Sequence, residues 1–198
     1  MQVLRRADFA AQPWKNGSGM SRLVAVYPQD AGYDMLFWQV TLTEIAADCA
    51  FSDLPNIDRL FMLIGGSGAQ LAFSGMGTGV TLKPAVAAPF APVAFRGDWK
   101  TDCRLTAGPV QVLNVMTRRG HASASIGVKR WGGAMLCVQR PGEVLLGVLL
   151  EGVTQLPGEV APLRPNDAVL LDSQRGETCV IESPQGTARV AVVRLTTR

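Results

Sequence analysis

Arg59 is the side chain in this sequence that is best suited to hold a small anion. It follows Asp58 at the start of an apolar, β-rich run, residues 60–64. A guanidinium at the mouth of a pocket forms two parallel hydrogen bonds with a carboxylate. The alternative is a partly buried ion pair with a nearby aspartate, which stabilises one conformation and binds nothing. Of the two, we expect a ligand-binding arginine.

Lys15 and Asn16 form a second candidate binding group. They precede Gly17 and Gly19 in a segment typical of a turn. Backbone N–H groups, the ammonium and the amide of such a turn can together bind a carboxylate or a formyl oxygen. A purely structural turn is the alternative, and the residues alone do not separate the two. Lys15 is also the candidate base if the protein is an enzyme, because burial readily lowers the pKa of a lysine.

Asn114 and Phe51 complete the set of candidate pocket residues. If residues 110–116 form a strand, the Asn114 side chain points the same way as its apolar neighbours two positions away, and it then needs buried hydrogen-bond partners. A structural hydrogen-bond cluster is the preferred interpretation of Asn114, and a pocket-lining amide is the alternative. Phe51 is proposed as an aromatic wall, although large aromatic residues in β-barrels are more often core.

Metal and nucleotide chemistry are disfavoured by what the sequence lacks. His121 is its single histidine, whereas zinc, copper and non-haem iron sites usually use two or three imidazoles. Cys49, Cys103, Cys137 and Cys179 form no C-x-x-C pair and are expected to be reduced thiols. The sequence contains no nucleophile elbow and no phosphate-binding loop. We therefore expect no metal and no cofactor.

The elements that must position these residues are predicted to be β-strands. The 198 residues include 21 Gly and 12 Pro, and 47% are hydrophobic, which suits a sizeable core crossed by short strands and turns. Residues 36–43 alternate between apolar and polar, as in a half-buried strand. The further β-rich runs are 60–64, 69–73, 93–95, 110–116, 135–138, 144–150, 168–171, 178–182 and 189–195.

The chain also shows a weak internal repeat, because residues 60–71 resemble residues 144–156. The repeat predicts a mainly all-β protein with few short helices, arranged as two stacked jelly-roll β-barrels in one chain, a bicupin. We expect an N-terminal barrel over residues 1–110 and a C-terminal barrel over residues 111–198, packed as one unit, with N-terminal strands that can cross over.

Charge and hydropathy limit the possible partners. The formal net charge is only +3, and the basic region between Asp102 and Glu143 contains few aromatic residues, so nucleic acid is disfavoured. That region is a solvated face, a subunit edge or the source of an arginine for a small carboxylate. The apolar run 144–150 is far shorter than the ~20 residues of a spanning helix. We expect a cytoplasmic protein with no membrane partner, and a homodimer because sheet edges are exposed.

Four short blocks of residues occur in an order that is typical of one family. The blocks are Pro13-Trp14-Lys15-Asn16-Gly17-Ser18-Gly19, Phe51-Ser52-Asp53-Leu54-Pro55-Asn56-Ile57-Asp58-Arg59, Phe95-Arg96-Gly97-Asp98, and Gly108-Pro109 followed by Asn114-Val115-Met116-Thr117-Arg118-Arg119. In this the sequence resembles the HutD/Ves family over nearly its whole length. The resemblance implies a cytoplasmic bicupin without the cupin metal, tied to histidine utilisation, with a sensing role toward formylated glutamate.

The sequence departs from the pattern of that family at four positions. Ser18 stands where a third glycine is usual, Gln39 where arginine is common, and Val112 where aspartate is usual. Loss of that arginine and that aspartate reflects either the paired deletion of an internal salt bridge or a changed ligand. Asn56 replaces a glycine, which is a milder change because asparagine tolerates the left-handed backbone conformation.

These observations lead to the hypothesis of a metal-independent bicupin that binds a small carboxylate, N-formyl-L-glutamate or a related intermediate, and thereby modulates histidine utilisation. One alternative is a metal-free enzyme acting on such an acid, with Lys15 as the base and Arg59 as the substrate clamp. Another is a stress-linked interaction protein without a ligand. We favour a protein that is not an enzyme, because its carboxylate pairs come with no nucleophile or metal. The expected ligand-binding residues are Lys15, Asn16, Phe51, Arg59 and Asn114.

Overall fold

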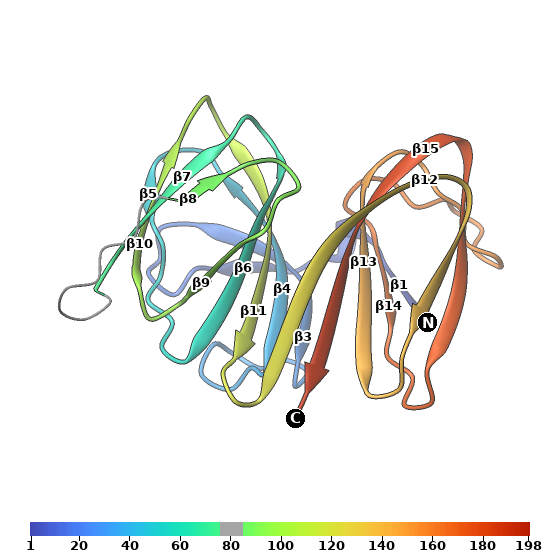
Figure 1. The fold of residues 1–198 in the computed structure, drawn as a ribbon, viewed down its shortest axis with the longest axis horizontal. Coiled ribbons are helices and arrows are strands. Elements are labelled where there is room, and N and C mark those ends of the chain that lie inside the picture. Colours follow the sequence, from blue (N-terminus) through green and yellow to red (C-terminus); the bar gives the residue numbers. More distant parts are fainter. Residues whose placement is uncertain (76–84) are drawn as a thin grey trace. The chain divides into compact units, whose positions relative to one another are not determined.

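The computed structural model describes residues 1–75 and 85–198, and β-strands dominate its regular elements. The described residues contain one helical turn, η1 (Arg6–Asp8). By their contacts the residues form two units (Figure 1). The N-terminal unit is Ala10–Ser123, and the C-terminal unit combines Met1–Phe9 with Ala124–Arg198. The prediction of an all-β chain with few short helices is confirmed.

The N-terminal unit is built on two antiparallel sheets. The strand order is β2-β3-β4-β11-β6-β9 in the six-stranded sheet and β5-β10-β7-β8 in the four-stranded sheet. The bounds are β2 (Ala11–Pro13), β3 (Met20–Tyr27), β4 (Trp38–Ile45), β5 (Cys49–Ala50), β6 (Ile57–Gly65), β7 (Ala69–Ser74), β8 (Ala85–Ala87), β9 (Val93–Arg96), β10 (Lys100–Leu105) and β11 (Val110–Arg118).

The C-terminal unit has one five-stranded sheet with the order β1-β14-β13-β15-β12. Its strands are β1 (Gln2–Leu4), β12 (Ala122–Gln139), β13 (Glu143–Glu151), β14 (Ala168–Leu171) and β15 (Glu177–Thr197). The N-terminal strand β1 belongs here because it pairs antiparallel with β14. Arg5 then fixes the segment by donating hydrogen bonds to the carbonyl oxygens of Ala161 and Pro162, both at 2.9 Å.

The pairing of the strands differs from the expected architecture in two respects. The strands form open sheets rather than closed barrels, because the hydrogen-bonded order of each sheet ends at an edge strand. The contacts divide the chain after Ser123 rather than near residue 110. The reason is that β11 pairs with both β4 and β6, so the whole of this strand lies inside the N-terminal unit.

Two sequence predictions about individual strands also change. The alternation over residues 36–43 does produce a strand, β4, but this strand is buried on both faces instead of one. Gln39, Thr41 and Thr43 therefore face the interior of the protein, whereas Glu44 is exposed. The two runs expected at 178–182 and 189–195 are parts of a single long strand, β15.

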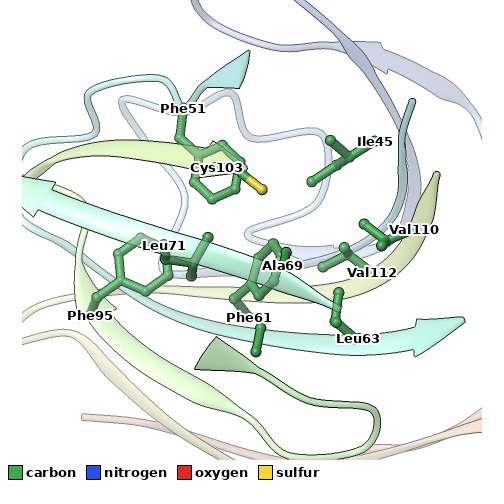
Figure 2. Packing of buried hydrophobic residues seen from close by; sticks show 11 residues of the cluster. Ile45, Phe51, Phe61, Leu63, Ala69, Leu71, Phe95, Cys103, Val110 and Val112 are labelled. Carbon is green, nitrogen blue, oxygen red and sulfur yellow. The ribbon is translucent and has the colours of Figure 1, made fainter. Parts of the chain in front are cut away.

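The core of the N-terminal unit lies where its two sheets supply apolar side chains to one cluster. Figure 2 shows Phe61, Leu63 and Phe95 from the six-stranded sheet together with Leu71 and Cys103 from the four-stranded sheet. The Phe51 ring packs against Phe61, with ring centroids 5.6 Å apart. Burial of such side chains is the main force that holds the sheets together.

We predict that Leu63→Ala lowers the free energy of unfolding by about 2–5 kcal/mol, because Leu63 is fully buried and its truncation leaves a cavity in the core. Urea unfolding measures this change. Val86→Ala is the matched control at a side chain that is 66% exposed, and it should alter stability by less than about 0.5 kcal/mol. Equal effects of the two variants would contradict the proposed core.

Candidate functional site

The candidate site lies on the inner face of three neighbouring strands, β4, β11 and β6. In the register of the six-stranded sheet, Asn114 is opposite Thr41 on one side and Phe61 on the other, and Met116 is opposite Arg59. Because side chains two residues apart share a face of a strand, Arg59 and Asn114 point into the same side of the sheet. Both line one cavity of about 30 Å³.

Arg59 is buried between two aromatic rings. The residue is 8% exposed. Its Cζ atom lies 4.8 Å from the centroid of the Phe51 ring and 5.1 Å from the centroid of the Phe95 ring. These are favourable cation–π distances. Among the described residues, no carboxylate pairs with Arg59, and its buried Nε–H has no acceptor. A desolvated cation of this kind is costly unless an anion accompanies it.

The same burial shifts the pKa values of Arg59 and of its neighbour Tyr33. Burial lowers the pKa of Arg59 from 12.5 to about 10, and Tyr33 partly offsets this change. The guanidinium is therefore still a cation at neutral pH. Burial raises the pKa of the Tyr33 hydroxyl, while the charge of Arg59 acts in the opposite direction. The cavity thus contains one positive charge and a neutral phenol.

Asn114 contributes an amide that is also not satisfied. The residue is 7% exposed, and its Oδ1 atom has no hydrogen-bond partner among the described residues. The other polar groups of the wall bind each other: Trp14 Nε1–H donates to Ser21 Oγ at 2.9 Å, and Ser21 and Thr43 share a hydrogen bond of 2.6 Å. Arg59 and Asn114 are therefore two buried lining residues with hydrogen-bonding capacity left for a ligand.

The aromatic wall is held by backbone hydrogen bonds between two motif blocks. Phe51 N–H donates to Thr101 O at 2.9 Å, and Leu54 N–H donates to the oxygen of Gly97 at 2.8 Å. Gly97 has to be glycine, since a Cβ atom there would lie 2.6 Å from Leu54 O. This close approach brings the segment that carries Phe51 against the strand that carries Phe95.

Lys15 and Asn16 lie outside the lining of this cavity. Lys15 is exposed and its Nζ is 3.4 Å from an Asp34 carboxylate oxygen. Asn16 donates to Ala50 O at 3.1 Å and accepts from the backbone and the hydroxyl of Ser18 at 3.1 and 2.8 Å. The geometry matches the structural alternative for these residues, a hydrogen-bonded turn. Ser18 takes part in the turn through its hydroxyl group.

Arg118 and Arg119, at the end of β11, hold segments that surround the cavity without lining it. Arg118 donates to the backbone oxygens of Leu36 and Tyr33, both at 2.8 Å, and so fixes the segment that carries Tyr33. Arg119 pairs with Asp58 at 2.9 Å and with Asp98 at 2.7 Å. Asp58 is thus bound to Arg119, and among the described residues no aspartate forms the ion pair with Arg59 that the structural alternative expected.

The departures from the family pattern occupy buried or constrained positions. Asn56 adopts φ 62°, the left-handed conformation for which glycine is usual. Gln39 is fully buried and donates to Gln12 at 3.0 Å, and Val112 lines the cavity. Gln39 is opposite Met116 while Val112 is opposite Thr43, which separates them by about 13 Å along the strands. Side chains at this separation do not form one direct salt bridge. The spacing therefore favours a changed cavity as the explanation for Gln39 and Val112.

Sequence reasoning missed three kinds of site residue. Trp14 was noted only as part of a motif block, Tyr33 was not considered, and the Thr43 face of β4 was treated as one side of a half-buried strand. The alternating polar residues of β4 were a usable signal, because each of them pairs with at least one apolar residue of an adjoining strand. Tyr33 lies in an irregular segment, where periodicity gives no information.

Three further findings concern the described residues as a whole. In the part of the chain that is described, no three His, Cys, Asp or Glu side chains are grouped so that they could hold a metal ion. The four cysteines are free thiols. No described helix is long and apolar enough to cross a membrane.

Comparison with known proteins first defines the fold class. A cupin 2 conserved barrel domain protein from Leptotrichia buccalis superimposes with a TM-score of 0.59 at 5% identity, covering 97% of this chain and 95% of that chain. The protein is therefore all-β and cupin-like. The HutD family model matches residues 6–189, and the chain belongs to the HutD family.

Individual relatives agree with this assignment. A conserved protein of unknown function from Pseudomonas aeruginosa has a TM-score of 0.79 at 23% identity and covers 98% of both chains. HutD from Pseudomonas fluorescens SBW25 has a TM-score of 0.77 at 23% identity, covering 100% of this chain and 98% of that one. An uncharacterised protein in the hutC 3′ region of Pseudomonas putida is 27% identical over 116 residues, which is 59% of this chain. The match spans 57% of the length of that relative.

We predict that Asp98→Asn destabilises the protein at pH 7 by no more than about 1 kcal/mol, the range of a partly exposed ion pair. Hydrogen bonds from Arg119 and from the Asn56 N–H lower the pKa of Asp98. A lowered pKa in the folded state means stabilisation above the unfolded value of about 4, and loss of that stabilisation as the pH falls through the folded pKa.

The difference in unfolding free energy between wild type and Asp98→Asn should therefore shrink as the pH is lowered from 7 to 3. Urea titrations at each pH measure it. Asp102→Asn, an exposed change in β10, is the control and should show no such trend. A constant difference between wild type and Asp98→Asn at all pH values would refute the ion-pair interpretation.

Proposed function

We propose that this HutD-family protein binds the carboxylate of a small acid at Arg59, without a metal, and that this binding modulates histidine utilisation. The proposed ligand is N-formyl-L-glutamate or a related intermediate. The observation that carries the proposal is the buried guanidinium of Arg59, which has no counter-ion among the described residues and faces a cavity.

The charge of Arg59 explains why the ligand should be an anion. A carboxylate that enters the cavity supplies the missing counter-ion and accepts charge-assisted hydrogen bonds from the guanidinium. The cost of desolvating Arg59 is already met in the empty protein, so binding does not add it. Phe51 and Phe95 hold the cation in place between their rings, which leaves the guanidinium little freedom to lose on binding.

The amide of Asn114 narrows the class of acid. An amide side chain presents one acceptor oxygen and one donor group. It can therefore accept from the N–H of an acylated amino acid or donate to a formyl oxygen, depending on which way the amide is turned. An N-formyl amino acid offers a carboxylate and both of these groups within a few bonds. This match supports an N-acyl amino acid over a simple dicarboxylate.

The size of the cavity limits how much of the ligand is enclosed. A single water needs roughly 10–15 Å³ of such volume, and the cavity offers about 30 Å³. It encloses a group with two or three heavy atoms, such as a carboxylate. The remainder of a larger acid has to extend past Tyr33 and Ser52, two residues of the lining.

The lining supports binding more than turnover. In the described part of the chain it contains no carboxylate, thiol or imidazole, and Lys15, the base of the enzymatic alternative, is not part of it. Two relatives support the ligand class and the pathway. The Pseudomonas fluorescens HutD structure is named for a formate condition, and the Pseudomonas putida relative for the hutC region.

The assembly is part of the same proposal. We infer that the two units are the two halves of a bicupin and that the protein acts in the cytoplasm as a homodimer. The cupin-like fold of the chain supports the first of these statements, and the edge strands left at the ends of each sheet support the dimer.

The test of the proposal is Arg59→Met, measured by thermal and urea unfolding with and without formate or N-formyl-L-glutamate. In wild type, a ligand at 100 times its dissociation constant adds about 2.7 kcal/mol to stability. In Arg59→Met this gain should vanish. The variant without ligand should be more stable than wild type by about 1 kcal/mol or more, because an unpaired buried charge has been replaced by an apolar chain.

Arg96→Met is the matched control, since Arg96 is exposed on the strand that carries Phe95. It should change neither the stability nor the ligand response. A structural Arg59 would give the opposite result, a destabilised Arg59→Met protein. Flat responses of wild type to every acid would favour the interaction protein without a ligand.

A second variant, Asn114→Asp, places an internal carboxylate on the face that carries Arg59. We predict that it pairs with Arg59, so that ligand affinity falls at least 10-fold, which corresponds to about 1.4 kcal/mol. Isothermal titration calorimetry with N-formyl-L-glutamate measures this change. Asn114→Leu is its companion, because it removes the amide without adding a charge and should weaken binding less. Unchanged affinity in Asn114→Asp would mean that the anion does not bind beside this residue.

A further inference from the structure

A second cavity, separate from the Arg59 site, lies within the C-terminal unit. Its volume is about 210 Å³, and apolar side chains from four strands form most of its lining. These side chains include Met135 of β12, Leu145 of β13, Val169 of β14 and Ile181 of β15. Leu136 and Val138 also line it and remain exposed, so the cavity is open to solvent on that side.

Gly147 lies in the lining of this cavity and puts no side chain into it. It lies inside β13 on the same face as Leu145 and Leu149, both of which are buried in the apolar cluster of this unit. Its backbone does not adopt a positive φ, and the nearest atom to an added Cβ would be Val190 Cγ2 at 3.4 Å, an ordinary contact. Neither conformation nor crowding therefore requires glycine here. A larger side chain at this position would occupy the cavity, and a strand glycine of this kind often marks the approach of a ligand.

The charged groups of the lining are both cations. Arg194 is already engaged, because its Nη1 lies 2.6 Å from Glu143. Lys129 is exposed and forms no ion pair among the described residues. The lining itself contains no acidic residue in the described part of the chain. An apolar molecule that carries a negative charge would thus meet a complementary group at Lys129.

We propose that this cavity binds a small apolar carboxylic acid, with its hydrocarbon body beside Gly147 and its carboxylate at Lys129. An engineered apolar cavity of about 150 Å³ is large enough to bind benzene, so 210 Å³ accommodates a single ring or a short branched chain with an acidic head. The Arg59 cavity, at about 30 Å³, encloses only the carboxylate of such an acid and not its body. The two sites therefore differ in the part of an acid that they enclose.

The experiment uses benzoate as the probe and the full chain as the protein. Ligand-observed NMR and calorimetry should show benzoate binding to wild type. Gly147→Leu should abolish this binding, or weaken it at least 10-fold, since the new side chain fills the cavity. Gly147→Val is the smaller alternative if the leucine variant does not fold. Gly127→Leu is the matched control: Gly127 lies in β12, has no atom within 4 Å of an added Cβ, and is not part of the lining.

Two further variants separate the parts of the proposal. Lys129→Gln should weaken benzoate about 2- to 5-fold, the effect of an exposed ion pair, while binding of benzyl alcohol should not change. Arg59→Met should leave benzoate binding intact, so that failure at one site is distinguished from failure at the other. The proposal is overturned if benzoate does not bind, or if it binds equally well to folded Gly147→Leu. Benzoate binding that is lost in Arg59→Met and retained in Gly147→Leu would also overturn it.

Discussion

The central constraint in the N-terminal unit is the burial of one positive charge. The guanidinium of Arg59 lies between Phe51 and Phe95 and has no anion among the described residues to compensate it. Cation–π contacts are worth about 2 kcal/mol when desolvated, whereas leaving a buried charge unpaired costs several kcal/mol. Two such contacts approach that cost in magnitude, but they supply no counter-ion. Under the proposed function, a bound anion supplies the missing counter-ion and raises the stability of the unit.

The rest of the unit is arranged around this charge. The four motif blocks, which are far apart in the sequence, contribute to one place: Trp14 and Phe51 to the wall, Arg59 and Asn114 to the polar centre. The block at residues 95–98 supplies the second ring and the Asp98 partner of Arg119. The paired arginines after Asn114 do not enter the cavity. They hold the segments that carry Tyr33 and Asp58, and thereby keep Asp58 away from Arg59.

Local sequence pattern predicted many of the strands and the shared face of Asn114 with its apolar neighbours, because alternation with a period of two depends only on adjacent residues. It missed β3, β10 and the first part of β12, among others. It did not reveal that β6 lies beside β11, which is what brings Arg59 next to Asn114, since strand order is a long-range property. The turn at Lys15 and Asn16 is fixed by hydrogen bonds from Asn16 to Ala50 and Ser52. These residues are distant in the sequence, so no local pattern identifies them. The pairing of β1 with β14 was hidden for the same reason.

The enclosed position of Arg59 also decides how salt acts on this protein. A surface cluster of cations responds to ionic strength as such, through screening over a Debye length of about 10 Å at 0.1 M. An enclosed guanidinium is screened far less, and it responds instead to which anion is small enough to reach it. Under the proposed function, chloride and formate in a buffer compete for the Arg59 cavity, whereas anions with no group small enough to enter it act through ionic strength alone. The apparent affinity of the proposed site then depends on the composition of the buffer as well as on its ionic strength.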